Sequence, residues 1–232
     1  MNIFSQTFNT LLIKPLFNAL ILLYEYSPGR DFGIAIIALT ILVRIALYPL
    51  MVRAIKSRKA LSKLQPKVKE VQEKFKDDQK KQMEEITRLY KEENINPLGA
   101  LLPSLIQLPL LIALFQVFWK GVQSVEAAGL YSFVPLSGEI NYTFLGLINI
   151  SQMNIVLAVL TAIAQFFQLK ISTSKSNDKA SEMSQKQMPY FFSAFTFIFL
   201  LRLPAALALY WLTTSVFLII QEYSLKNYDK SR

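Results

Sequence analysis

Five long apolar runs restrict the fold of this chain more than any other feature. Hydrophobic residues make up 53% of the 232 residues, a share too high for an ordinary soluble domain. A bilayer interior offers no hydrogen-bond partners to the backbone, so only helices and closed barrels cross it, and a spanning helix needs about 20 apolar residues. The sequence therefore predicts an all-α polytopic membrane protein with a core of five transmembrane helices. The predicted spans are 32–52, 97–120, 153–170, 188–202 and 203–222.

The N-terminal segment 1–31 is apolar but contains Lys14-Pro15, which divides its hydrophobic stretch. Each half is shorter than the ~20 residues of a spanning helix, so we interpret residues 1–26 as an amphipathic helix at the membrane interface, followed by a turn. The alternative is an uncleaved signal anchor, because Leu16–Tyr26 resembles the hydrophobic region of a signal peptide.

Basic residues in the connecting segments predict the orientation in the membrane. Residues 53–96 carry 13 Lys or Arg, residues 170–187 carry four and the tail 223–232 carries three, whereas the loop 121–152 carries none. Because positive loops stay in the cytoplasm, we expect segments 53–96, 171–187 and 223–232 to be cytoplasmic. With five spans, the N-terminus is then extracytoplasmic and the C-terminus cytoplasmic.

The cytoplasmic segment 53–96 carries apolar residues at helical spacing on both sides of Asp77-Asp78. This pattern predicts a hairpin of two short helices with a narrow apolar seam. Pro66 fits a helix start and Pro97 follows the second helix. The hairpin is either a solvated surface or a docking arm. The seam residues are Val68, Val71, Phe75, Ile86, Leu89 and Tyr90.

A single arginine, Arg44, interrupts the first apolar span. A guanidinium keeps its proton, and placing it at the centre of a bilayer costs from about 3 to more than 10 kcal/mol. No Asp or Glu lies within the apolar runs to pair with it, apart from Glu222 at the last position of the fifth span. An unpaired intramembrane charge is a candidate functional group.

Further polar residues share helix faces within the spans. Thr40 lies one turn before Arg44, and the fifth span carries a comparable polar face. Such residues either bond helices to one another or line a water-filled cavity open to the cytoplasm. The candidates besides Arg44 are Thr40, Gln107, Gln165, Gln168, Tyr210, Trp211 and Thr214.

The composition excludes several kinds of chemistry. Cys and His are absent, so disulfides, thiol redox chemistry, His or Cys metal sites and imidazole catalysis are excluded. Intramembrane carboxylates and a phosphate-binding loop are also missing from the sequence, and we predict neither an enzyme nor any cofactor or metal. The net charge of +9 is explained by membrane orientation rather than by binding nucleic acid.

The chain resembles the YidC/Oxa/Alb family of membrane protein insertases after about residue 30, most closely its short YidC-like bacterial form. The order and spacing of several motifs carry this resemblance. They are Leu39-Thr-Ile-Leu-Val-Arg44 with Pro49-Leu50, Leu64-Gln-Pro-Lys67 with Gln72-Glu-Lys-Phe-Lys76, Asn96-Pro-Leu-Gly99 with Leu102-Pro103 and Ile106-Gln-Leu-Pro109, and Leu203-Pro-Ala-Ala-Leu-Ala-Leu-Tyr-Trp211.

The resemblance implies a hydrophilic groove, closed to the outside and open to the cytoplasm and to lipid. Arg44, Gln168 and Trp211 match groove residues of the family, with Gln165 as the alternative to Gln168 if the register shifts by one turn. The hairpin resembles the family's mobile arm. Relatives often have Gly in place of Ala206 and Asn in place of Ser215.

The implied function is insertion and folding of client membrane proteins in the bacterial plasma membrane, without nucleotide hydrolysis. The client's short hydrophilic segment enters the groove near Arg44, and its transmembrane helix moves into lipid. The implied partners are nascent membrane proteins and lipids, the protein acts as a monomer, and contacts with the ribosome and the Sec translocon stay open. The alternatives are a membrane-embedded assembly chaperone that translocates nothing and a small-solute transporter.

Overall fold

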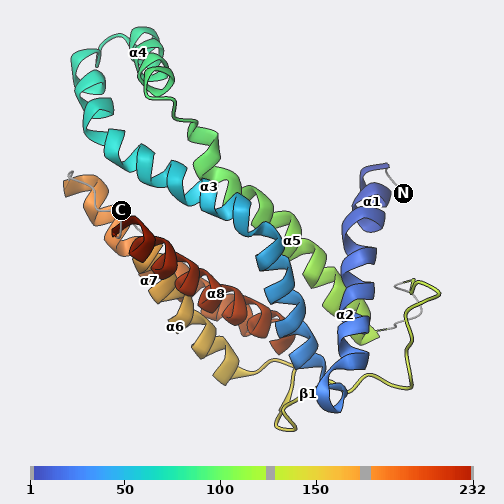
Figure 1. Ribbon diagram of the computed structural model, residues 1–232. Helices are drawn as coiled ribbons and strands as arrows, with labels where there is room; N and C mark the ends of the chain where they lie inside the picture. The colour runs from blue at the N-terminus through green and yellow to red at the C-terminus, as the bar shows by residue number, and fades with distance from the viewer. Residues whose placement is uncertain (1–2, 124–128, 173–178, 231–232) are drawn as a thin grey trace.

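The computed structural model describes residues 3–123, 129–172 and 179–230, and most of these residues are helical (Figure 1). The predicted all-α membrane fold is confirmed. The elements are α1 (Ile3–Phe8), the π-helical turn η1 (Asn9–Ile13), α2 (Lys14–Tyr26), the 3-10 turn η2 (Pro28–Arg30), α3 (Phe32–Lys74), α4 (Gln79–Glu92), α5 (Pro97–Gln123), β1 (Thr143–Phe144), β2 (Ile148–Asn149), α6 (Ile155–Ser172), α7 (Lys179–Leu200) and α8 (Ala205–Lys230).

The helices form two groups that meet along α3 and α8 (Figure 1). Helix α6 packs against both α7 and α8, whereas α2 and α5 pack against α3. Aromatic and aliphatic side chains such as Phe17, Phe32 and Phe118 are fully enclosed between the helices. The outward faces of α6 and α7 carry exposed apolar side chains, including Ile163 and Phe195. Such faces fit a hydrocarbon environment.

The N-terminal segment, predicted as one interfacial helix, is helical on both sides of Lys14-Pro15, and Pro15 lies in the first turn of α2. Helical structure continues from Ile3 to Tyr26, and a π-helical turn over Asn9–Ile13 precedes Pro15. A wider turn accommodates the ring and the missing N–H of proline. The segment Gln6–Tyr26 is long and apolar enough to cross a membrane. This continuity favours the spanning alternative over the interfacial one.

The helix that contains the first predicted span, 32–52, continues beyond residue 52. Helix α3 runs for 43 residues, from Phe32 to Lys74, and includes both Pro49 and Pro66. The prediction that Pro66 starts a new helix is therefore wrong. Proline inside a helix typically causes a kink, and α3 changes direction along its length as it leaves the bundle (Figure 1).

The hairpin is otherwise as predicted. The last turn of α3 ends before Asp77, and Asp78 caps α4 by accepting a hydrogen bond from the Lys81 N–H at 3.0 Å. The six seam residues are all partly buried. An ion pair between Lys67 and Glu93, at 2.6 Å, joins the two helices, and Glu93 raises the pKa of Lys67 through this hydrogen bond and its charge.

The last two helices extend beyond the apolar runs. Helix α7 begins at Lys179, inside the predicted loop 171–187, and α8 continues to Lys230, inside the predicted tail 223–232. Hydropathy marks the part of a helix that suits lipid, whereas the hydrogen-bonded helix continues into polar sequence. The helical structure is interrupted between the predicted spans 188–202 and 203–222, because α7 ends at Leu200 and α8 begins at Ala205.

Four of the described helical segments are long and apolar enough to span a membrane, and Gln107–Phe118 of α5 is a shorter apolar helix. The four include the N-terminal segment Gln6–Tyr26 and do not include α7. The predicted core of five transmembrane helices therefore stays a prediction.

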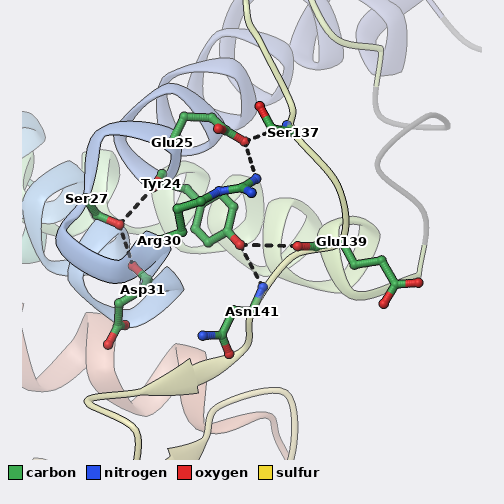
Figure 2. A network of polar contacts seen from close by, with 8 residues as sticks. All are labelled: Tyr24, Glu25, Ser27, Arg30, Asp31, Ser137, Glu139 and Asn141. Carbon is green, nitrogen blue, oxygen red and sulfur yellow. Dashed lines mark hydrogen bonds and ion pairs between the residues drawn. The ribbon is translucent and has the colours of Figure 1, made fainter.

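The described part of the loop between α5 and α6 is bound to the turn between α2 and α3 (Figure 2). The Asn141 N–H donates to the Tyr24 hydroxyl at 2.8 Å, and the Ser137 N–H donates to Glu25 at 2.9 Å. Asp31 caps α3 by accepting from the Gly33 N–H at 2.8 Å, and it also accepts from the Leu145 N–H at 2.6 Å. These contacts fix one end of the bundle.

We expect Asp31→Ala to lower the free energy of unfolding by about 2–4 kcal/mol, because it removes a helix cap and leaves buried N–H groups without a partner. Asp31 is only 6% exposed. The matched control is Asp78→Ala, which removes an exposed cap of α4 and should cost about 1 kcal/mol or less. Thermal unfolding in detergent measures both, and equal losses would contradict the role of Asp31.

Candidate functional site

Arg44 lies inside the bundle and is 2% exposed. Its Nη2 donates to Gln107 Oε1 of α5 at 2.6 Å and to Thr214 Oγ1 of α8 at 3.3 Å. The buried Nε has no hydrogen-bond partner among the described residues. The predicted candidates Arg44, Gln107 and Thr214 therefore meet, although they belong to different helices.

Gln107 connects Arg44 to another predicted residue. Its Nε2 donates to the hydroxyl of Tyr210 at 2.9 Å, and Tyr210 is 1% exposed. Arginine has no acceptor atom, so the amide oxygen of Gln107 must face Arg44 and the amide nitrogen is left for Tyr210. We call Arg44, Gln107, Tyr210 and Thr214 the Arg44 cluster.

The partners of Arg44 in this cluster are all neutral. Ion pairs elsewhere in the described chain, such as Arg58 with Glu222 and Lys67 with Glu93, do not involve it. A buried charge without an opposite charge is costly, whereas a carboxylate can form two parallel hydrogen bonds with a guanidinium. The cluster is therefore suited to receiving an acidic group.

Two other predicted residues lie in the interior, and the hydrogen bonds described for Arg44 do not involve them. The Thr40 hydroxyl donates to the Ile36 carbonyl of its own helix at 2.6 Å. Gln165 on α6 is 6% exposed, and its Oε1 has no partner among the described residues. An unsatisfied buried amide oxygen is available to a polar group that enters the bundle.

Gln168 and Trp211 are not brought into the Arg44 cluster. Gln168 is half-buried, and its Nε2 contacts the Ser172 hydroxyl at 3.5 Å. Trp211 is partly buried and packs against the hydrophobic core. Their assignment to a groove stays a prediction.

Ser193, Thr196 and Gln221 are among the buried polar residues that sequence reasoning missed. Ser193 and Thr196 lie on α7, 8% and 1% exposed, and the Ser193 hydroxyl has no partner among the described residues. Gln221 on α8 is 3% exposed, and neither atom of its amide has a described partner. The spacing of Ser193 and Thr196 in a Phe-rich helix could have indicated a polar face, because residues three apart lie on the same side of a helix.

No group of three or more His, Cys, Asp or Glu side chains that could hold a metal ion occurs in the described part of the chain.

The apolar helices around a buried polar cluster define a polytopic α-helical membrane protein. The sequence model of the family described as 60Kd inner membrane protein matches residues 22–232, and the chain belongs to this family. The chain is 34% identical over 218 residues to a protein of Actinobacillus pleuropneumoniae named membrane protein insertase YidC, a match covering 94% of this chain and 37% of the relative.

Proteins of the same name from other bacteria show similar identity. The one from Chlorobaculum tepidum is 33% identical, over 94% of this chain and 36% of the relative. The one from Geobacter metallireducens is 34% identical, over 91% of this chain and 36% of the relative. The chain thus spans little more than a third of the length of these relatives.

Proposed function

We propose that this protein is a membrane protein insertase, which moves hydrophilic segments of client proteins across the membrane and releases their helices into lipid. The observation that carries the proposal is the Arg44 cluster, a buried guanidinium held only by neutral partners. The names of the relatives support the same activity.

In the proposed mechanism Arg44 attracts the short acidic segment of a client into the bundle, where Gln165 and Ser193 offer further hydrogen bonds. This shortens the path that polar groups travel through hydrocarbon. The client's apolar helix then leaves along outward faces such as that of α6, and burial of apolar surface supplies roughly 25 cal/mol per Å². No nucleotide is required.

The proposed orientation places the hairpin and the C-terminus in the cytoplasm, because the basic residues lie there. Helices α2 and α3 run antiparallel on either side of the turn at Pro28–Arg30 (Figure 1). If α2 belongs to a spanning helix, residue 3 lies on the cytoplasmic side. The extracytoplasmic N-terminus predicted from the sequence applies only if the N-terminal helix is interfacial. Lipids and nascent membrane proteins are the proposed partners, and the protein is proposed to act as a monomer.

The experiment is reconstitution of the full chain alone in liposomes without nucleotide. A single-span client with an acidic N-terminal segment is added, and protease protection of that segment is measured. We expect protection in proteoliposomes and not in empty liposomes. Binding of the client without protection would instead identify an assembly chaperone, and solute flux without protection would identify a transporter.

We expect the hairpin to be required for insertion but not for the fold of the bundle. The Gly99 Cα lies close to Ser57, where an added Cβ would be 2.9 Å from the Ser57 hydroxyl, so a short Gly-Ser linker can replace residues 65–95. The seam is only partly buried, and its loss should leave the thermal unfolding of the bundle within about 1 kcal/mol. Protease protection of the client should fall at least several-fold. Full protection by the shortened protein would contradict a functional arm.

A further inference from the structure

We propose that Gln107 holds Arg44 in the resting state and is displaced by the client's carboxylate, so that Gln107 and Tyr210 set the preference for acidic over neutral segments. This inference rests on the proposed insertase function. It concerns positioning residues, since Gln107 and Tyr210 act through Arg44 rather than on the client directly.

Gln107 is the nearer of the two partners of Arg44 Nη2. Its oxygen lies 2.6 Å away, whereas the Thr214 hydroxyl lies 3.3 Å away. Because Arg44 is 2% exposed, an entering group cannot reach the guanidinium until neighbouring side chains move. The amide of Gln107 is the group that a new acceptor must replace.

A carboxylate can make that replacement favourable. It forms charge-assisted, bidentate hydrogen bonds with a guanidinium, which are about twice as strong as those to a neutral acceptor. The Nε of Arg44, which has no described partner, supplies the second donor of such a pair. A client segment without a carboxylate gains nothing by displacing Gln107 and inserts without binding Arg44. Only acidic segments therefore depend on how firmly Gln107 is held, and the exchange selects for negative charge.

Tyr210 controls how firmly Gln107 is held. Its hydroxyl accepts from Gln107 Nε2 at 2.9 Å and thereby keeps the amide oxygen pointed at Arg44. Without this contact the amide can rotate away, and Arg44 becomes easier to reach. Replacing Gln107 by Glu and replacing Tyr210 by Phe should therefore have opposite effects on the preference for acidic segments.

The test measures the insertion ratio of two single-span model clients, identical except that one has Asp and the other Asn in the N-terminal segment. The full-length protein is reconstituted in phosphatidylglycerol and phosphatidylethanolamine liposomes. Gln107→Glu places a permanent carboxylate on Arg44, so the ratio of acidic to neutral insertion should fall about tenfold. Tyr210→Phe removes one neutral hydrogen bond that holds Gln107, so the ratio should rise about threefold.

The control is Thr213→Val, because the Thr213 hydroxyl donates only to the Leu209 carbonyl of its own helix at 2.8 Å. It should keep the ratio of the unchanged protein. A merely structural defect lowers insertion of both clients together and leaves the ratio unchanged. In an Arg44→Ala background, Gln107→Glu should no longer affect the ratio, since the two residues act as one unit.

If Gln107→Glu fails to fold, as judged by thermal unfolding, Tyr210→Phe alone decides. An unchanged or lowered ratio for Tyr210→Phe overturns the inference, as does an unchanged ratio for a folded Gln107→Glu. In either case the insertase proposal stands if the unchanged protein protects the client segment from protease. If the unchanged protein gives no protection at all, the insertase proposal itself is overturned.

Discussion

Arg44→Ala is expected to reduce insertion of an acidic client by roughly a hundredfold, because removing one partner of a buried charge pair typically costs about 2–5 kcal/mol. The free energy of unfolding should not fall correspondingly. The substitution removes a buried charge that has only neutral partners in the resting protein, and such a charge stabilises little. Protease protection in liposomes and thermal unfolding in detergent separate the two effects.

Arg44→Lys is the matched variant, since it keeps the charge and loses the planar fork. We expect it to retain part of the activity. In cells depleted of their own insertase, the unchanged protein should restore growth and Arg44→Ala should not. Full rescue by Arg44→Ala would contradict an essential charge, and equal failure of both variants would show that the bidentate geometry matters as much as the charge.

Gly33→Ala is expected to destabilise the protein by about 2–3 kcal/mol, although the same change inside a helix usually stabilises by about 1 kcal/mol. Gly33 lies in the first turn of α3 and is buried. An added Cβ would come within 2.7 Å of Phe144 Cγ and 2.9 Å of Phe144 Cβ. The ring of Phe144 must move, and this residue belongs to the loop that Asp31 holds on the bundle.

Gly99→Ala is the control for this change. Its Cβ would meet the Ser57 hydroxyl at 2.9 Å, and a hydroxyl is the end of a side chain that can rotate away. Its effect on unfolding should be within about 1 kcal/mol of zero. A similar loss of stability for both glycine variants would contradict the close packing of Gly33 against Phe144.

The sequence was sufficient to predict the all-α membrane fold, because apolar runs and proline breaks are local signals. Helix ends were predicted less well. Pro66 lies inside α3, where local rules expect a helix to begin or to be interrupted. The start of α7 at Lys179 lies in polar sequence, where hydropathy carries no information about the helix.

The candidate site was predicted in part. Helical spacing indicates that Thr40 and Arg44 share a face, and that Tyr210 and Thr214 share another. It does not determine how each helix is rotated against its neighbours, so the contact of Gln107 with both Arg44 and Tyr210 required the structure. For the same reason the spacing could not distinguish the buried Gln165 from the half-buried Gln168.

The most direct test of the central claim is photocrosslinking of a ribosome-stalled client from two positions on α6. A photoreactive residue replaces either Gln165, which is 6% exposed, or Ile163, which is 49% exposed on the outward face. If the Arg44 cluster receives the client's polar segment, that segment should crosslink from position 165, and the client's apolar helix should crosslink from position 163. Crosslinking of the polar segment from position 163 alone would contradict passage through the interior.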